Sequence, residues 1–262
     1  MIELQSNFIE LSTGATFHYL DSGGADKPVM VALQGRMGMP EIDMPQIIDW
    51  LSPDYRFIAP SLRGYGQSTP KPRSYPIGFY QRDARDVVAF IEALNIAPVH
   101  LLGYSDGGEV ALLTAAYQPM LIKSLAVWGA VGYYGPEMRP WVQRNYPGTW
   151  ITEDDKRIHG ITEPDKLALE WVTACKFIID SGGDLSLSLA EKITAPLLLM
   201  LGDQDHLNPI AYGQKLVDRA PQGRLEVFQS GHGIHEQQWE QFQAVVGAFL
   251  TSPDSSGASH TK

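Results

Sequence analysis

Apolar runs and amphipathic segments alternate along most of this chain. Short apolar runs such as Val29 to Leu33 are typical of parallel strands that are buried on both faces of a sheet. Longer segments have the helical period, most clearly from Phe79 to Asn95, where Val87, Phe90 and Leu94 lie on one apolar face. Because strands and helices alternate, the pattern predicts an α/β fold, in which one mostly parallel sheet has helices on both faces.

The predicted strands occupy residues 2–11, 15–20, 29–33, 56–59, 99–102, 124–128, 197–201 and 225–228, which makes a sheet of eight strands. The predicted helices occupy residues 44–51, 79–95, 109–117, 165–179, 210–218 and 239–250.

The alternation is interrupted after the sixth predicted strand, where residues 131–193 hold helical patterns and many aromatic residues. We therefore expect an α/β core formed by residues 1–130 and 194–250, a helical cap formed by residues 131–193, and a flexible tail at residues 251–262. The cap aromatics either attach the cap to the core or line an apolar pocket beyond the carboxyl ends of the strands, where ligands bind in open α/β sheets. We favour the pocket for some of them, the candidates being Tyr133, Tyr134, Trp141, Tyr146, Trp150 and Trp171.

The composition narrows the classes of function. The chain has 262 residues, a formal net charge of −10 and a single cysteine, Cys175. The negative charge argues against nucleic acid or an anionic membrane as the main partner, and a single cysteine excludes an intrachain disulfide. The sequence has neither a signal-peptide pattern nor an apolar run of roughly 20 residues, so we expect a cytoplasmic protein that acts on a small molecule.

One turn carries the clearest chemical signature. Residues 99–108 read V-H-L-L-G-Y-S-D-G-G, and strong helix formers follow from residue 109. A G-x-S-x-G turn between a strand and a helix is the nucleophile-elbow pattern. Gly103 and Gly107 let the strand and the helix approach closely, and the N-terminus of the helix favours negative charge beside Ser105. The pattern therefore predicts that Ser105 is a nucleophile.

A serine nucleophile needs a base and an acid that orients the base. Of the seven histidines we favour His232, because it lies between two glycines in the loop after the last predicted strand. His235 is expected to support this loop or the pocket instead. After the seventh predicted strand, Asp205 is favoured as the acid over Asp203, which we expect to form the turn. The resulting order along the chain, serine then aspartate then histidine, is the one that this type of fold uses.

The oxyanion intermediate needs two backbone N–H donors. We expect one from Asp106, directly after the nucleophile, and the other from Arg36, in the loop after the third predicted strand. These residues predict acyl transfer through a covalent ester, without a metal ion or an organic cofactor.

Several motifs resemble those of the α/β-hydrolase superfamily. That superfamily commonly has H-G-x-x-G after its third strand and D-x-R-G-x-G-x-S after its fourth, where this chain has Q-G-R-M-G at residues 34–38 and S-L-R-G-Y-G-Q-S at residues 61–68. The segments L-L-G-Y-S-D-G-G, V-W-G-A and G-H-G-I-H are similar to the valacyclovir-hydrolase-like (biphenyl-hydrolase-like) serine esterases. The resemblance implies the α/β-hydrolase fold with a helical cap after the sixth strand, and cleavage of small carboxylic esters. Gln34 in place of histidine and Ser61 in place of aspartate affect loop-bracing contacts rather than the three catalytic candidates.

Asp106 bears on the choice of substrate. In the group that this chain resembles, an acid at this position is linked to recognition of the α-amino group of amino-acid esters. Alternatively, its carboxylate caps the following helix or pairs with Arg36. Other functions compatible with the same residues stay open, namely a carbon–carbon bond hydrolase, a perhydrolase, a proline-releasing aminopeptidase and a ligand-binding module without turnover.

Overall fold

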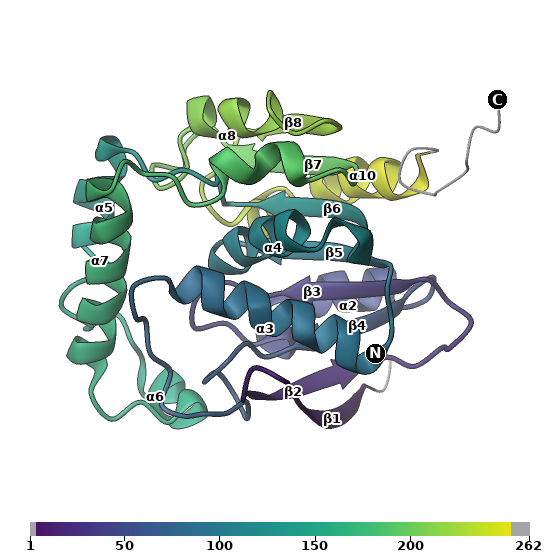
Figure 1. Cartoon of the computed structure of the whole chain (residues 1–262), viewed down its shortest axis with the longest axis horizontal. Coiled ribbons are helices and arrows are strands. Elements are labelled where there is room, and N and C mark those ends of the chain that lie inside the picture. The colour runs from purple at the N-terminus through teal and green to yellow at the C-terminus, as the bar shows by residue number, and fades with distance from the viewer. Residues whose placement is uncertain (1–3, 253–262) are drawn as a thin grey trace.

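The computed structural model of the protein describes residues 4–252, in which a central sheet is covered by helices on both faces (Figure 1). Its strands are β1 (Gln5–Glu10), β2 (Thr16–Asp21), β3 (Val29–Leu33), β4 (Arg56–Pro60), β5 (Val99–Tyr104), β6 (Ile122–Trp128), β7 (Leu197–Gly202) and β8 (Gly223–Phe228). Its α-helices are α1 (Pro40–Asp43), α2 (Pro45–Leu51), α3 (Phe79–Leu94), α4 (Asp106–Tyr117), α5 (Arg139–Gln143), α6 (Glu153–His159), α7 (Pro164–Asp180), α8 (Ile210–Val217), α9 (Ile234–Gln237) and α10 (Trp239–Thr251). Short 3₁₀ helices occur at η1 (Pro119–Leu121), η2 (Pro136–Met138) and η3 (Leu187–Lys192).

Within residues 4–252, the strands form one eight-stranded sheet in the order β1-β2-β4-β3-β5-β6-β7-β8. β2 is antiparallel to both of its neighbours, and all the other pairs are parallel. The chain runs outward from β3 to β4 and then returns to the opposite side of β3 as β5, with Leu33 paired to Gly103. The carboxyl ends of β3 and β5 are therefore neighbours at a topological switch point, which is where open α/β sheets bind ligands.

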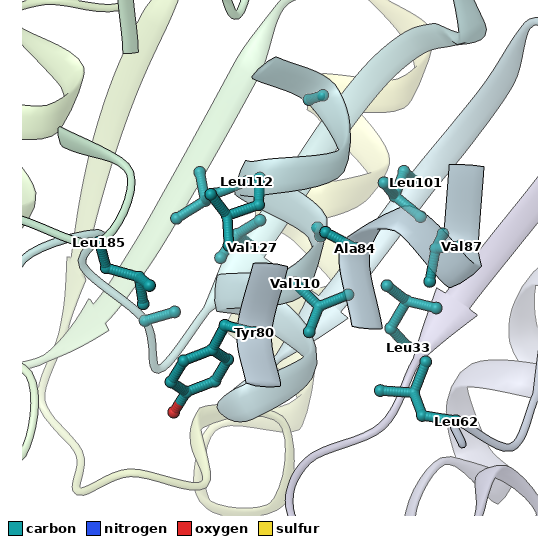
Figure 2. Packing of buried hydrophobic residues seen from close by; sticks show 14 of the residues in the cluster. Leu33, Leu62, Tyr80, Ala84, Val87, Leu101, Val110, Leu112, Val127 and Leu185 are labelled. Carbon is teal, nitrogen blue, oxygen red and sulfur yellow. The ribbon is translucent and has the colours of Figure 1, made fainter. Parts of the chain in front are cut away.

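Successive residues of the central strands face opposite layers of the core. In β3, Val31 and Leu33 belong to the apolar layer beneath α3 and α4, whereas Met30 and Ala32 belong to the layer beneath α2 and α10. In Figure 1, α3 and α4 lie in front of the sheet, and α2 and α10 lie behind it. Figure 2 shows how several elements contribute to the first layer, with labelled side chains that include Leu33, Val87, Leu101, Val110 and Val127.

Residues 131–193, which connect β6 to β7, are termed the insertion. The insertion contains helices and, apart from a single bridge between Tyr133 and Asp184, no extended pairing. In Figure 1, α5 and α7 stand together on the left, beyond the carboxyl ends of the parallel strands. Leu185 of the insertion packs into the same apolar layer as α3 and α4, so one continuous core joins the insertion to the sheet (Figure 2).

The fold agrees with the eight strands that the sequence predicts, and the boundaries differ by a few residues. β5 continues to Tyr104 and α4 begins at Asp106, so the turn between them is tighter than the sequence pattern suggested. The short helix α1 has no amphipathic pattern and was not predicted. The prediction of a flexible tail falls mainly on residues 253–262, which lie outside the described part of the chain. From residue 4 to residue 252, no helix has the length and apolar character needed to cross a membrane.

Candidate active site

Ser105 occupies a strained turn between β5 and α4. Its φ of 53° and ψ of −123° place a non-glycine residue in a region that costs on the order of 1–3 kcal/mol. The surrounding backbone is so close that only glycine fits beside the turn. A Cβ atom on Gly103 would lie 2.7 Å from the carbonyl oxygen of Gly107, and a Cβ on Gly107 would lie 2.6 Å from that of Leu33. The close approach of β3, β5 and α4 holds Ser105 at the crest of the turn.

The structure brings the three predicted catalytic residues together from three strand ends. The Oγ atom of Ser105 lies 2.8 Å from Nε2 of His232, and Nδ1 of His232 lies 2.7 Å from Oδ2 of Asp205. Gly129, whose φ is 65°, leaves room for the imidazole, because a Cβ there would lie 2.9 Å from its Cε1 atom. These contacts have the geometry of a nucleophile, a base and an orienting acid.

Asp205 is held in place by several donors. Asn208 donates to Oδ2 and the backbone N–H of Leu207 donates to Oδ1, each at 2.9 Å. Burial opposes ionisation of this carboxyl, but the hydrogen bond and the charge interaction with His232, together with the hydrogen bonds from Asn208 and Leu207, keep its pKa below the ordinary value. Asp205 is therefore suited to accept from a charged imidazole. Asp203 is exposed, and its backbone N–H donates to Phe228 at the turn after β7.

Arg36 and Asp106 line the same pocket as Ser105, which has a volume of about 210 Å³. In the described part of the chain, neither the backbone N–H of Arg36 nor that of Asp106 donates to a protein acceptor. Asp106 begins α4, where the first amides of a helix have no intrahelical partner. Two residues that line the pocket, one in the loop after β3 and one at the start of α4, thus have backbone amides without a protein acceptor among residues 4–252.

The loop after β3 is braced in spite of its departures from the superfamily pattern. Gln34 is fully buried, and its side-chain amide can donate to the carbonyl of Pro60 at 2.9 Å and accept from the N–H of Leu62 at 3.2 Å. Ser61 is buried too, and its carbonyl accepts a hydrogen bond from the Ser68 hydroxyl at 2.6 Å. Gln34 therefore connects the loop after β3 to backbone groups at the end of β4 and in the loop after it, whereas the Ser61 carbonyl braces the loop after β4 internally.

The side chain of Asp106 is bound by two neutral donors. Tyr80 of α3 donates its hydroxyl to Oδ1 at 2.6 Å, and Trp171 of α7 donates its indole N–H to Oδ2 at 3.0 Å. The two predicted internal roles of this carboxylate, capping of α4 and pairing with Arg36, are both wrong. The carboxylate does not cap α4, and within residues 4–252 no ion pair joins it to Arg36. Asp106 is 9% exposed and faces the pocket.

Arg36 turns its side chain away from Asp106 and into the insertion. Its guanidinium lies between two indole rings, 3.9 Å from the centroid of Trp171 and 4.5 Å from that of Trp150. The guanidinium also donates to Asn145 in the insertion. Trp171 consequently separates the two charged groups, with Arg36 on its face and Asp106 at its edge.

The aromatic residues of the insertion that were predicted to line the pocket do so only in part. Of the six aromatic candidates in the insertion, Tyr134 and Trp171 line the pocket. Tyr133 packs on Tyr212 instead, and Trp141 stacks on His206. The other two, Tyr146 and Trp150, are partly exposed.

His235 is buried behind the site, where its Nδ1 accepts from the indole N–H of Trp128. Sequence reasoning missed Tyr80, Tyr104 and Asn208. Tyr104 and Asn208 line the pocket, and Tyr80 holds Asp106 from a helix whose apolar face gave no sign of a polar contact.

Comparisons with known proteins agree with this fold. Residues 46–245 match the model of the Alpha/beta hydrolase family. The protein named Serine hydrolase BPHL from Mus musculus is 30% identical over 248 residues, which cover 90% of this chain and 84% of that protein.

Two solved structures have the same fold at lower identity. The esterase EaEST from Exiguobacterium antarcticum has a TM-score of 0.74 at 22% identity, covering 95% of this chain and 100% of its own. The 2-hydroxy-6-oxo-6-phenylhexa-2,4-dienoate hydrolase BphD from Rhodococcus sp. strain RHA1 has a TM-score of 0.75 at 19% identity. The match covers 95% of this chain and 100% of that structure. From the family match and the 30% identity, the chain belongs to the alpha/beta hydrolase family and is a hydrolase of that class.

Proposed function

We propose that this hydrolase cleaves carboxylic esters of small molecules through a catalytic triad of Ser105, His232 and Asp205. The observation that carries the proposal is the pair of contacts at His232, 2.8 Å to the Ser105 hydroxyl and 2.7 Å to the Asp205 carboxylate. A serine hydroxyl is a weak nucleophile at neutral pH, and a base within hydrogen-bond distance activates it.

The reaction follows from this geometry. Nε2 of His232 accepts the proton of Ser105 while Oγ attacks the ester carbonyl, and the amides of Arg36 and Asp106 stabilise the negative charge that develops on the carbonyl oxygen. His232 then donates the proton to the departing alcohol, which leaves an acyl group on Ser105. In the second half, His232 takes a proton from water as the water oxygen attacks the acyl group. His232 then returns this proton to Oγ of Ser105 as the bond to the acyl group breaks and the acid is released. Asp205 keeps the imidazole oriented and stabilises its charged form throughout.

Asp106 supports a more specific proposal, that the preferred substrates carry an α-amino group beside the ester carbonyl. Its carboxylate is largely buried, lies next to the nucleophile in the chain, and is bound by the neutral donors Tyr80 and Trp171 alone among the described residues. A buried carboxylate without a cationic partner gains most from a cation supplied by the ligand. An ammonium group on the acyl part of the substrate fits this position.

A labelling experiment tests the triad. A fluorophosphonate probe should react with the wild-type protein and fail to react with Ser105→Ala, and peptide mapping should locate the adduct on Ser105. A wild-type protein that is not labelled contradicts the proposal. Labelling at Ser105 without turnover of any ester would favour a binding module instead.

A matched substrate pair tests the preference for an amino group. The p-nitrophenyl esters of 2-aminobutyrate and 2-methylbutyrate differ at one position, where an ammonium group replaces a methyl group. The proposal expects a higher kcat/KM for the 2-aminobutyryl ester. Equal values of kcat/KM for the two esters would contradict the proposed recognition of the ammonium group, but would not contradict the proposed triad.

A further inference from the structure

The turn that presents the Arg36 amide contains an unusual backbone conformation. Gly35 to Gly38 form a tight turn closed by a hydrogen bond from the Gly38 N–H to the Gly35 carbonyl, 3.2 Å long. Met37, the third residue of this turn, has a φ of 65°. A turn with a positive φ at that position normally has glycine there, and a side chain in this region costs roughly 1–2 kcal/mol. The surroundings must therefore stabilise the turn.

His159, the last residue of α6 in the insertion, contacts this turn directly. Its Nε2 lies 2.9 Å from the Met37 carbonyl oxygen, across 122 positions of sequence, and its Nδ1 lies 3.0 Å from the backbone nitrogen of Gly66. The carbonyl can only accept and the N–H can only donate, so the partners assign the neutral imidazole with its proton on Nε2. The ring is 1% exposed and packs edge-on against Tyr65.

The surroundings of His159 also favour the neutral imidazole. Burial lowers the pKa of His159, and the positive charges of Lys71 and Arg73 act in the same direction. The hydrogen bond to Met37 and the negative charge of Asp155 act in the opposite direction and do not overcome burial.

The insertion thus binds two consecutive residues of the turn, Met37 through its carbonyl and Arg36 through its guanidinium. We propose that His159 is a positioning residue for hydrolysis, which holds the turn so that the Arg36 N–H faces the oxyanion. The inference rests on the proposed function, because it takes the Arg36 amide as an oxyanion donor. If His159 has this role, the oxyanion hole is complete only when the insertion is docked on the turn.

Two substitutions separate the two hydrogen bonds of the ring. In His159→Gln, the side-chain amide N–H reaches the position of Nε2 and can keep the bond to Met37. In His159→Asn, the side-chain oxygen reaches the position of Nδ1 and keeps the bond from Gly66, but the bond to Met37 is lost. Both variants place an uncharged amide in the same buried space, so each is the control for the other.

The measurements are the kcat and KM for p-nitrophenyl 2-methylbutyrate and the rate of fluorophosphonate labelling at Ser105. Loss of one oxyanion donor costs roughly 10²–10³ in kcat, so a mispositioned donor should cost about ten- to one-hundred-fold. We expect this loss in His159→Asn, with KM within about threefold of wild type and labelling slowed in proportion, since the donor acts mainly on the transition state. His159→Gln should retain kcat within about threefold.

Three outcomes would overturn the positioning role: equal losses of kcat in the two variants, a loss confined to KM, or an unchanged kcat in His159→Asn. If the wild-type protein itself is not labelled, the proposed function fails instead, so the two failures are distinguishable.

Hydrogen exchange on the wild-type protein gives a test that does not depend on the folding of a variant. The Gly66 amide should exchange no faster than the amides of α6, because its hydrogen bond breaks only when His159 moves away from the turn. Exchange of Gly66 at the rate of exposed backbone would contradict the proposal.

Discussion

The indole N–H of Trp171 donates a hydrogen bond to the carboxylate of Asp106, over 3.0 Å. Asp106 directly follows the nucleophile candidate in the α/β core, whereas Trp171 belongs to α7 of the insertion. This contact means that the insertion helps to form the wall of the pocket. It also keeps the carboxylate beside the site without neutralising it, because the indole is an uncharged donor.

The charge of Asp106 should control the preference between substrates. Asp106→Asn retains the shape of the side chain and removes its charge. Hydrogen bonds to charged groups contribute about 1.5–3 kcal/mol, so kcat/KM for the 2-aminobutyryl ester should fall roughly ten- to one-hundred-fold. The value for the 2-methylbutyryl ester should change by less than about threefold. An equal fall for both esters would show that Asp106 acts on the geometry of the site rather than on the ammonium group.

Asp205 should be needed for the correct orientation of His232. In Asp205→Asn, the amide can present a donor to Nδ1 of His232, which favours the wrong tautomer of the imidazole. The same change in a serine protease triad lowers kcat by about 10⁴, and we expect a loss of this order here with little change in KM. Asp203→Asn is the matched control, because Asp203 is exposed and lies two positions away. Similar losses in both variants would argue against Asp205 as the acid of the triad.

The elbow should not tolerate a side chain at Gly107. A Cβ there would lie 2.6 Å from the Leu33 carbonyl oxygen and closer still to that of Gln34, so Gly107→Ala must push β3 and α4 apart. We expect a loss of about 3 kcal/mol in the free energy of unfolding, measured by urea denaturation, together with a loss of activity.

Gly247→Ala is the control for this prediction. Gly247 lies in α10, where the nearest atom to an added Cβ, on Trp50, is 3.6 Å away. Because alanine is the better helix former, this variant should be more stable by up to about 1 kcal/mol. A Gly107→Ala protein as stable as wild type would mean that the packing at the elbow is looser than described.

His100 should make the stability of the protein depend on pH. It is buried within β5, where its Nδ1 lies 2.7 Å from the Ser124 hydroxyl, and burial, aided by Lys123, lowers its pKa from 6.5 to about 4. The unfolded chain therefore binds a proton that the folded chain does not, and the free energy of unfolding should fall as the pH drops from about 6.5 to about 4. The difference between the two pKa values corresponds to roughly 3 kcal/mol.

The variant His100→Asn tests this expectation, since its side-chain oxygen can replace Nδ1 beside Ser124 but cannot bind a proton. The free energy of unfolding should be measured by urea denaturation at pH 7 and at pH 4.5. From pH 7 to pH 4.5, the free energy of unfolding should fall more for the wild type than for His100→Asn. Parallel pH dependences for the variant and the wild type would rule out His100 as the source.

Local patterns in the sequence were sufficient to predict the sheet and the sites along its edge. Apolar runs of strand length, helical periods and the glycines around Ser105 are properties of neighbouring residues, and they are read directly from the chain. In a parallel sheet the carboxyl ends of the strands meet at one edge. Residues that follow separate strands, such as Ser105, Asp205 and His232, could therefore be predicted to meet.

The contacts of the insertion could not be predicted in this way. Tyr80 and Trp171 meet at Asp106, and His159 binds Met37, through segments that are far apart in sequence and differ in type. Some of these residues belong to predicted helices or to short motifs, but neither the helical period nor the motifs mark the contacts, because the side chains would equally suit an ordinary core.

The sequence by itself determined the order of the elements, the sharp turn at Ser105 and the residues that a shared strand edge brings together. Only the tertiary structure decided that Asp106 is held by two neutral donors, that Arg36 points into the insertion, and that His159 supports the strained turn at Met37. The physical reason is that these contacts depend on how the helices of the insertion dock on the sheet. That docking comes from the packing of many side chains at once, which no local pattern records.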